Sequence, residues 1–270
     1  ERARVDAKVL NDHTLEAKTQ NVTALQIHFK SGHAPLHLLK DSTLNIDGQT
    51  ISIGRPQSDR SLSIDLHKKD GKWSLGNAPT QGLAKVHGLT GPVDDAFMDA
   101  FLFVTPSQKS PSTKVQSWLD SELPRAIKEW RKTFRGDITS KKDTDIKEAD
   151  YANQNLVLWG DPQSNALIAK IVAQLPIEWT EKELKVNGKT YSTAEHLPIL
   201  VYPNPLNPKK YVVINSSFTF REYDYLNNAR QIAKLPDWTV INLNQAPNSM
   251  LPGKISDAGF FDETWKFQSK

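Results

Sequence analysis

The sequence predicts an α/β protein that begins with a β-rich unit, and three observations support this fold class. Short runs in which apolar and polar residues alternate fill the early part of the chain. Continuous apolar runs and segments of helical periodicity alternate later. A stretch rich in Gly, Pro and small residues separates the two patterns. We therefore predict a β-sandwich-like domain over residues 1–80, a linker over 81–94 and an α/β domain over 95–270.

The first domain shows the pattern of antiparallel strands. Alternation with a period of two places one face of a strand on a core and the other in water. Asp47-Gly48 and Asp70-Gly71 supply the positive φ angles that two-residue hairpin turns need. We expect a small β-sandwich or an open barrel, with strands at 14–18, 24–29, 43–46, 51–53, 62–66 and 72–75.

The second domain contains apolar runs that suit strands buried on both faces. Strand-like and helix-like segments alternate, which predicts a mostly parallel, Rossmann- or flavodoxin-like three-layer sheet. A hairpin insertion over 177–191, with Asn187-Gly188 at its turn, decorates it. The expected strands lie at 100–104, 156–159, 198–202, 211–215 and 238–243.

Three segments of the second domain have helical signals. Ser112 is a suitable N-cap for a helix that runs to about Arg135, and Pro124 is expected to kink or divide it. Two further helices are predicted, from Ser164 to Gln174 and from Arg221 to Lys234.

Composition and missing motifs exclude several function classes. The formal net charge is +3, with 34 basic and 31 acidic residues spread along the chain, so a nucleic-acid partner is not predicted. The absence of cysteine rules out disulfides and cysteine nucleophiles. No apolar run has the length of a membrane span. The spacing of His28, His33 and His37 fits no metal motif, and no phosphate-binding loop suggests a nucleotide, so we predict neither metal nor cofactor.

No residue is predicted to be catalytic. An α/β-hydrolase needs a Gly-x-Ser-x-Gly elbow around its nucleophile, and this motif is missing. Ser216 and Ser217 follow a strand, but Asn215 and Phe218 flank them. A serine nucleophile is therefore not supported.

The first candidate ligand site is the turn that follows the strand at 156–159. Gly160 permits a sharp turn, and the start of the next helix exposes N–H groups to which a ligand could bind. Asp161, Ser164 and Asn165 lie in this turn. The alternative interpretation is that Asp161 only caps the helix.

The second candidate follows the strand at 211–215 and includes Asn215, Ser216 and Arg221. Loops at the carboxyl ends of parallel strands line the ligand crevice in open α/β sheets. We expect the two loops to meet at one sheet edge and to bind an anionic or hydroxyl-rich ligand that Asp161 and Arg221 orient. A local ion-pair network around Arg221 is the alternative.

The seven tryptophans also suggest a platform for carbohydrate. Trp118, Trp130 and Trp159 lie on faces that the pattern predicts to be buried. The remaining candidates for such a platform are Trp73, Trp179, Trp238 and Trp265.

Several segments resemble the C-terminal region of large bacterial prolyl-oligopeptidase-like serine hydrolases or esterases. They are Gly88–Met98, Asn155–Pro162, Tyr202–Pro205 and Phe220–Tyr225. Ala3–Val22 is likewise similar to the β-rich segment that follows the α/β-hydrolase core of those proteins. In that family the nucleophile and its histidine belong to the upstream core, and no position here matches them.

The resemblance implies an accessory region of an exported, soluble hydrolase, located outside the cell or in the periplasm, with the upstream hydrolase domain as its partner. The N-terminal residues lack the apolar core of a signal peptide, so we expect a mature product or a fragment of a longer protein. Two function classes stay open. The first is a non-catalytic module that binds carbohydrate or an anionic small molecule, and the second is an independent hydrolase that uses the α/β cleft.

Overall fold

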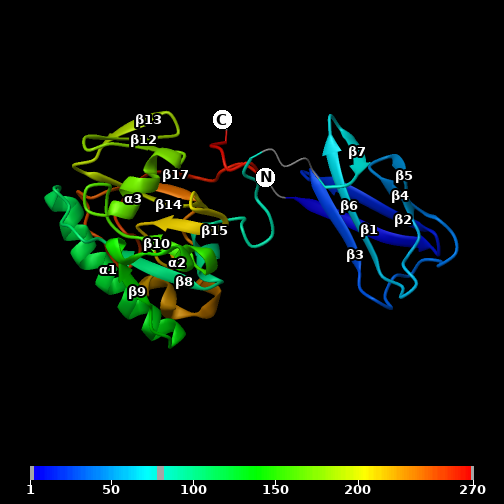
Figure 1. Ribbon diagram of the computed structural model, residues 1–270, viewed down its shortest axis with the longest axis horizontal. Coiled ribbons are helices and arrows are strands. Elements are labelled where there is room, and N and C mark those ends of the chain that lie inside the picture. Colours follow the sequence, from blue (N-terminus) through cyan, green and yellow to red (C-terminus); the bar gives the residue numbers. More distant parts are fainter. Residues whose placement is uncertain (1–2, 78–81, 269–270) are drawn as a thin grey trace. The chain divides into compact units, whose positions relative to one another are not determined.

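The structure, a computed structural model, describes residues 3–77 and 82–268 and divides the chain into two compact units (Figure 1). Unit 1 comprises Glu1–Gln81 and unit 2 comprises Gly82–Lys270. Residues 82–94, which we expected to form a linker, belong to unit 2. The reason is packing: Val93 is fully buried in the core of that unit, and the Lys85 ammonium pairs with a carboxylate there.

Unit 1 contains two sheets. The first has the order β1-β2-β4-β5, formed by β1 (Arg4–Asn11), β2 (Thr14–Gln20), β4 (Ser42–Ile46) and β5 (Gln49–Gly54). The second has the order β3-β6-β7, formed by β3 (Ala24–Phe29), β6 (Leu62–Lys69) and β7 (Lys72–Leu75). Leu44 of the first sheet and Leu66 and Trp73 of the second share one buried cluster. Unit 1 is therefore sandwich-like, as the alternating pattern predicted. Its strands pair in antiparallel fashion as expected, except that β2 and β4 are parallel.

Two predicted hairpin turns are confirmed in unit 1. Asp47 and Gly48 both have positive φ and connect β4 to β5, and Asp70 and Gly71 do the same between β6 and β7. This backbone matches the twist of the flanking strands. Strand β1 is an addition to the strands that the pattern indicated.

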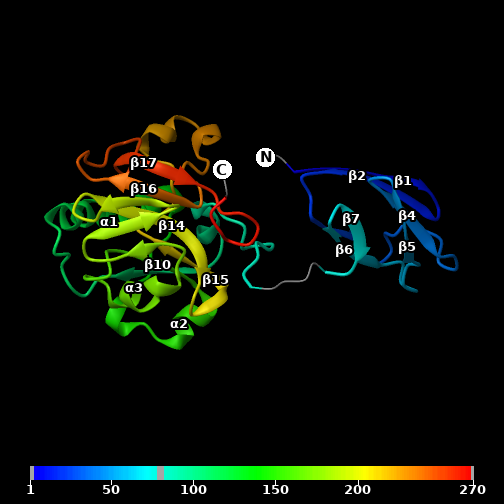
Figure 2. The same cartoon turned by 90° about the horizontal axis from the view of Figure 1, so that it is seen from above.

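The main sheet of unit 2 is mixed. Its order is β17-β16-β14-β15-β10-β8-β9, and Figure 2 shows β17 and β16 beside β14. Three of its pairings are parallel and three are antiparallel, so the expected mostly parallel, Rossmann- or flavodoxin-like pairing is wrong. The strands are β8 (Phe101–Thr105), β9 (Ser140–Lys142), β10 (Asn155–Leu158), β14 (His196–Asn204), β15 (Asn207–Ile214), β16 (Trp238–Asn242) and β17 (Lys254–Gly259).

Connection length explains this difference. Only Pro205 and Leu206 separate β14 from β15. A parallel crossover needs a dozen or more residues, so this short turn forces an antiparallel hairpin. Strand β10, in contrast, pairs in parallel with both β8 and β15, as its buried apolar pattern predicted.

Helix α1 (Thr113–Phe134) is the main helix of unit 2. The Ser112 side chain accepts from the Val115 N–H at its start, as predicted. Pro124 neither divides nor ends the helix, which continues to Phe134. Its buried stripe, which includes Trp118 and Leu119, packs into the unit's core and supports the turn in which Pro124 donates no backbone hydrogen bond.

The other predicted helices are shorter than expected or absent. The helix expected from Ser164 to Gln174 is α3, which spans only Ala166–Ile171 before the 3₁₀ turn η3 (Val172–Gln174). Helix α2 (Glu148–Asn153) was not predicted. The segment from Arg221 to Lys234 forms only the 3₁₀ turns η4 (Glu222–Leu226) and η5 (Asn228–Arg230). The Asn227 side chain accepts from the Arg230 N–H, and such local bonds compete with an α-helix.

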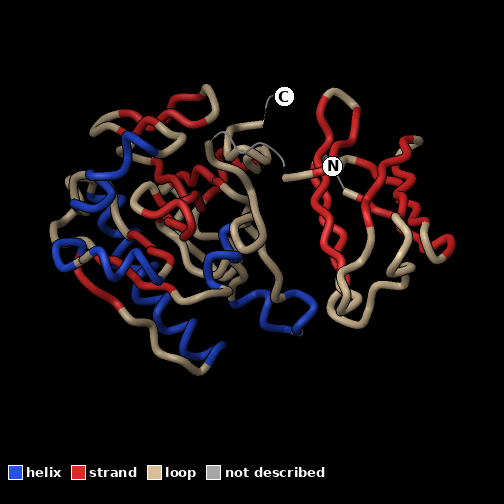
Figure 3. Tube along the Cα trace, turned by 45° about the vertical axis from the view of Figure 1, so that its right-hand side comes forward, coloured by secondary structure: helices blue, strands red, loops and turns tan. Residues whose placement is uncertain are grey.

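The hairpin insertion is confirmed as a small separate sheet. It contains β11 (Glu178–Trp179), β12 (Glu183–Val186) and β13 (Lys189–Ser192), with Asn187-Gly188 at a turn of positive φ. Figure 3 shows strands throughout both units and helices in unit 2. Within residues 3–77 and 82–268, no helix is long and apolar enough to cross a membrane.

Candidate functional site

The two predicted loops meet at one edge of the main sheet. Leu158 of β10 lies beside Ile214 of β15 in parallel register, so the loops that follow emerge together. The Gly160 N–H donates to Asn215 Oδ1 at 2.8 Å, and Asn215 Nδ2 donates back to the Gly160 carbonyl at 2.9 Å. The expected placement of these loops is therefore confirmed.

Glycine is required at position 160 for two reasons. Its φ of +115° lies in a region that L side chains rarely adopt. A Cβ at this position would also lie 2.6 Å from Ser164 Oγ. Asn215, which holds the turn, is itself left-handed with a φ of +55°. Both residues therefore fix the close approach of the two loops.

Asp161 is buried, and its carboxylate accepts hydrogen bonds within the turn. Its Oδ1 accepts from the Gln163 and Ser164 N–H groups at 3.0 and 2.8 Å. Its Oδ2 accepts from the Ser110 hydroxyl in a short hydrogen bond. Ser164 Oγ accepts from the Asp161 N–H at 3.0 Å. The carboxylate thus organises the turn, but it does not cap the helix as the alternative interpretation held, because the N-cap of α3 is Asn165.

The free N–H groups expected at the start of α3 are already bonded. Asn165 Oδ1 accepts from the Leu167 and Ile168 N–H groups, and the Asp143 carboxylate accepts from the Ala166 N–H. Asn165 Nδ2 also donates to the Trp159 carbonyl at 2.9 Å. An anionic ligand would have to compete with these protein acceptors, so this helix start is not a prepared anion site.

Arg221 is occupied by protein partners in the second loop. Its guanidinium makes a two-point contact with the Glu122 carboxylate of α1, at 2.7 and 2.9 Å, and its Nε donates to the Asn248 carbonyl. Arg221 and Glu122 are 5% and 4% exposed. Arg221 is therefore held in an ion pair, as the alternative stated, but its partner is Glu122 of α1 and not a carboxylate of its own loop.

Ser216 and its neighbours leave little space for a ligand. Ser216 Oγ donates to the Ser217 carbonyl at 2.9 Å. The Thr219 N–H and hydroxyl both donate to the Asp94 carboxylate. Burial raises the pKa of Asp94, and the hydrogen bonds from Thr219 offset this only in part. The cavity between Asn215 and Arg221 has a volume of about 20 Å³, which is room for about one water molecule.

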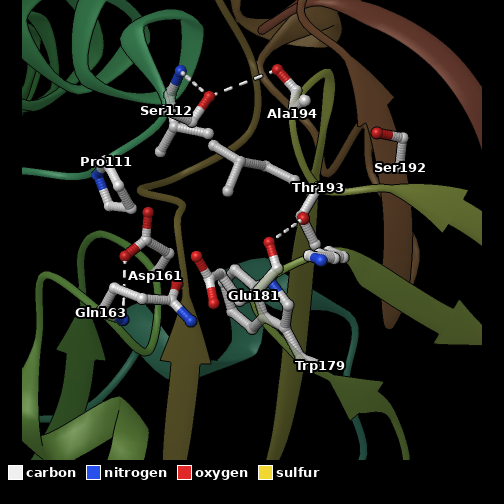
Figure 4. Close-up of a pocket in the computed structure, with 12 residues that line it drawn as sticks. Pro111, Ser112, Asp161, Gln163, Trp179, Glu181, Ser192, Thr193 and Ala194 are labelled. Atoms are coloured by element: carbon white, nitrogen blue, oxygen red, sulfur yellow. Dashed lines mark hydrogen bonds between the residues drawn. The ribbon is translucent and has the colours of Figure 1, made fainter.

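A larger cavity of about 290 Å³ lies on the other side of Asp161 (Figure 4). The start of α1, the turn after β10 and the hairpin insertion together surround it. Its lining consists of Pro111, Ser112, Val115, Asp161, Gln163, Trp179, Glu181, Lys182, Ser192, Thr193, Ala194 and Leu197.

Hydrogen bonds hold the wall of this cavity together. Ser112 Oγ donates to the Ala194 carbonyl at 3.2 Å, which joins the start of α1 to the hairpin segment. Thr193 Oγ1 donates to the Glu181 carbonyl at 2.5 Å. The hairpin insertion is thus fixed against the sheet edge, and it forms one side of a preformed cavity.

Among the amide and charged side chains of the lining, three have no protein partner within residues 3–77 and 82–268: the Gln163 amide, the Glu181 carboxylate and the Lys182 ammonium. Figure 4 shows Glu181 reaching toward the side that carries Asp161 and Gln163. These groups can donate to and accept from a ligand. Trp179, with Val115 and other apolar lining residues, adds apolar surface.

Sequence reasoning placed the candidate site one loop away from this cavity. Asp161 lies on its wall, but Gly160, Asn215, Ser216 and Arg221 do not line it. The hairpin insertion was interpreted as decoration, and its contribution was missed. Trp179 was among the tryptophans considered for carbohydrate, and it was the one available signal.

All four tryptophans considered for carbohydrate, Trp73, Trp179, Trp238 and Trp265, are buried in the cores of their units. Trp179, which is 6% exposed, is the one of them that also lines this cavity. The part of the chain that the structure describes contains no group of three or more His, Cys, Asp or Glu residues placed to hold a metal ion. No family model, curated protein or solved structure matches this chain.

Proposed function

We propose that this chain is a non-catalytic, ligand-binding region that accompanies an exported serine hydrolase. Its ligand is hydroxyl-rich, and it binds in the cavity lined by Gln163, Trp179 and Glu181. The observation that carries the proposal is a preformed cavity with unpaired polar side chains beside an aromatic ring.

The chemistry of the lining favours a neutral sugar over an anion. The unpaired groups are one amide, one carboxylate and one ammonium, and a hydroxyl can both donate to and accept from such a set. The part of the Trp179 side chain that lines the cavity supplies apolar surface for the C–H face of a sugar. The carboxylates of Glu181 and Asp161 disfavour a negatively charged ligand.

The volume of the cavity sets the size of the ligand. About 290 Å³ lies at the lower end of the range for small-molecule pockets, roughly 300–1,000 Å³. We therefore assign a monosaccharide or disaccharide unit to it, and a longer chain would extend into solvent.

The hydrogen bonds of nearby serines support a non-catalytic role. Ser110 donates to the Asp161 carboxylate and Ser112 donates to a backbone carbonyl, whereas the Ser-His-acid set of acyl transfer pairs the serine with a histidine. The His196 ring contacts the Ser192 carbonyl and the Asn242 amide. The upstream hydrolase domain and the exported location rest on the resemblance of Gly88–Met98 and the other similar segments.

A glycan array of neutral and acidic oligosaccharides tests the binding proposal. We expect the chain to retain neutral glycans, and Glu181→Gln to weaken their binding by about tenfold, as loss of one charged hydrogen bond implies. Glu183→Gln is the matched control, because Glu183 lies exposed on β12 outside the cavity. Equal affinity of the two variants for neutral glycans would mean that the ligand binds outside this cavity.

The independent-hydrolase alternative needs a separate experiment. We expect a serine-directed fluorophosphonate to leave the chain unlabelled and activated acyl esters to remain intact. Covalent labelling of one serine, lost on its replacement by alanine, would establish the alternative in place of the non-catalytic role.

A further inference from the structure

Strand β1 is a free edge of the first sheet of unit 1. It pairs with β2 on one side and, within the described residues, with no strand on the other. All eight of its residues, Arg4–Asn11, are exposed. An edge strand presents a row of unpaired backbone N–H and C=O groups, so β1 can accept another strand.

One face of β1 continues the apolar core face of the sheet. Ala7 lies opposite Ala17 and Val9 lies opposite Leu15 in the antiparallel register. Ala17 and Leu15 are 1% and 4% exposed, whereas Val9 is 48% exposed. The apolar face of the sheet therefore continues onto β1, where the second sheet of unit 1 does not cover it.

The opposite face carries charges of alternating sign. Asp6 lies opposite Lys18 of β2, and Lys8 lies opposite Glu16. Asp6 also pairs with Arg4 at 2.8 Å, and both side chains are more than half exposed. Exposed pairs contribute little stability, so Asp6 can exchange this partner.

These two patterns are self-complementary in a register centred on Ala7. When two copies of β1 run antiparallel and are centred on Ala7, Asp6 lies opposite Lys8 of the second copy and Val5 lies opposite Val9. A register centred on Asp6 or on Lys8 places like charges opposite each other, which is destabilising. A register centred between two residues mixes the apolar and charged faces.

We propose that two copies of this chain associate through β1, antiparallel and centred on Ala7. The first sheets of the two copies then form one continuous sheet, with four strands from each. On its charged face, Lys18 and Asp6 of one copy lie in line with Lys8 and Glu16 of the other. This association is independent of the ligand cavity in unit 2.

Sedimentation velocity of the full chain tests the proposal. The contact is one strand long, so association is expected at about 10–500 µM, the range of small interfaces. Over that range the mass should rise from 30.4 kDa to twice that value. Asp6→Lys alone and Lys8→Asp alone should each stay at 30.4 kDa, because each places like charges opposite one another.

An equimolar mixture of the two variants should double in mass again, because opposite charges then meet at both positions. This rescue also shows that both variants are folded. Glu16→Gln, which leaves the Asp6–Lys8 pairs intact, should associate like the unsubstituted chain. A constant 30.4 kDa for the unsubstituted chain at the highest concentration, or a mixture no heavier than its components, would overturn the proposal.

Discussion

Asp47 links the β4–β5 turn to both sheets of unit 1 and to Trp73 of its core. It has positive φ in the β4–β5 turn, and its carboxylate accepts from the Thr19 N–H and hydroxyl and from Trp73 Nε1, at 2.6–2.9 Å. Lys68 Nζ contacts it at 3.0 Å. Burial would raise the pKa of Asp47, but these hydrogen bonds outweigh it and hold the pKa well below its usual value.

Asp47→Asn should destabilise unit 1 by about 1–3 kcal/mol, because an amide loses acceptors for Trp73 and Lys68 while it tolerates the turn's backbone. Hydrogen exchange measured on peptides from β2 and β7 reports this loss. Unit 2 peptides are the internal control, and their exchange should not change. A uniform effect on both units would contradict this assignment.

The pH dependence of this difference has a defined sign. A carboxyl whose pKa is lowered by folding stabilises the protein above its unfolded pKa, about 3.9, and loses that contribution as the pH falls toward its folded value. The gap in stability between the unsubstituted chain and Asp47→Asn should therefore be full at about pH 7 and shrink below about pH 4. Urea unfolding at a series of pH values measures it, and a gap that widens in acid would contradict the mechanism.

Gly160 allows a second test at the residue scale. Gly160→Ala should cost about 2–4 kcal/mol, because strain at positive φ adds to a clash with Ser164 Oγ. Gly76→Ala is the matched control: Gly76 has a φ of +103°, but a Cβ there meets nothing within 4 Å. Because Gly76 lies in unit 1 and Gly160 in unit 2, thermal unfolding is followed for each unit separately. Gly160→Ala should destabilise unit 2 clearly more than the control destabilises unit 1, and equal losses would exclude the clash.

Residues whose structure depends on near neighbours could be predicted from the sequence. Ser112 caps α1 and Asn187-Gly188 forms a turn because the relevant groups lie within a few residues. The partner of Arg221 could not be predicted, since Glu122 lies 99 residues earlier in the chain. Glu181 was missed for the same reason, because only the folded hairpin brings it to the cavity.

At the scale of elements, the contact between α1 and the turn η4 is an ion-pair network. The Glu122–Arg221 pair is continued by Arg125, which binds Glu222 at 2.8 and 2.9 Å. Burial would lower the pKa of Arg125, but Glu222 and Glu122 outweigh it and raise that pKa. This network holds the segment that begins at Arg221, which forms 3₁₀ turns and no α-helix, against α1.

Arg221→Ala should destabilise unit 2 by about 3–5 kcal/mol, because it leaves the Glu122 carboxylate buried without its partner. Arg131→Ala on the same helix is the control: the Arg131–Asp137 pair is largely exposed, and its loss should cost less than about 1 kcal/mol. Urea unfolding compares them. A loss for Arg221→Ala as small as the control's would mean that the pair contributes nothing.

Helices and strands were predicted correctly where the sequence signal lies within the segment itself. The apolar stripe of α1 and the buried runs of β10 and β15 are properties of single segments, and they were predicted correctly. The direction of β14 depended on the length of one turn rather than on its apolar pattern. The segment after Arg221 has helical spacing, but its Asn and Asp side chains bond locally instead.

For the whole molecule, two separate cores imply that each unit is stable alone. Unit 2 contains every residue that lines the cavity. A fragment of residues 82–270 should therefore fold and bind the same glycans as the full chain, within about twofold in affinity. Circular dichroism and the glycan array check this, and a folded fragment that binds none of them would show that unit 1 contributes to the site.

The central claim is that the ligand binds in the cavity lined by Gln163, Trp179 and Glu181. The indole N–H signals of the tryptophans test this claim most directly. Trp179 lines that cavity, whereas Trp159 lines the small cavity near Arg221. During titration with the best glycan from the array, we predict a saturable shift of the Trp179 indole signal, assigned through Trp179→Phe, while the Trp159 signal stays in place. A shift of the Trp159 signal alone, or of neither, would contradict the account.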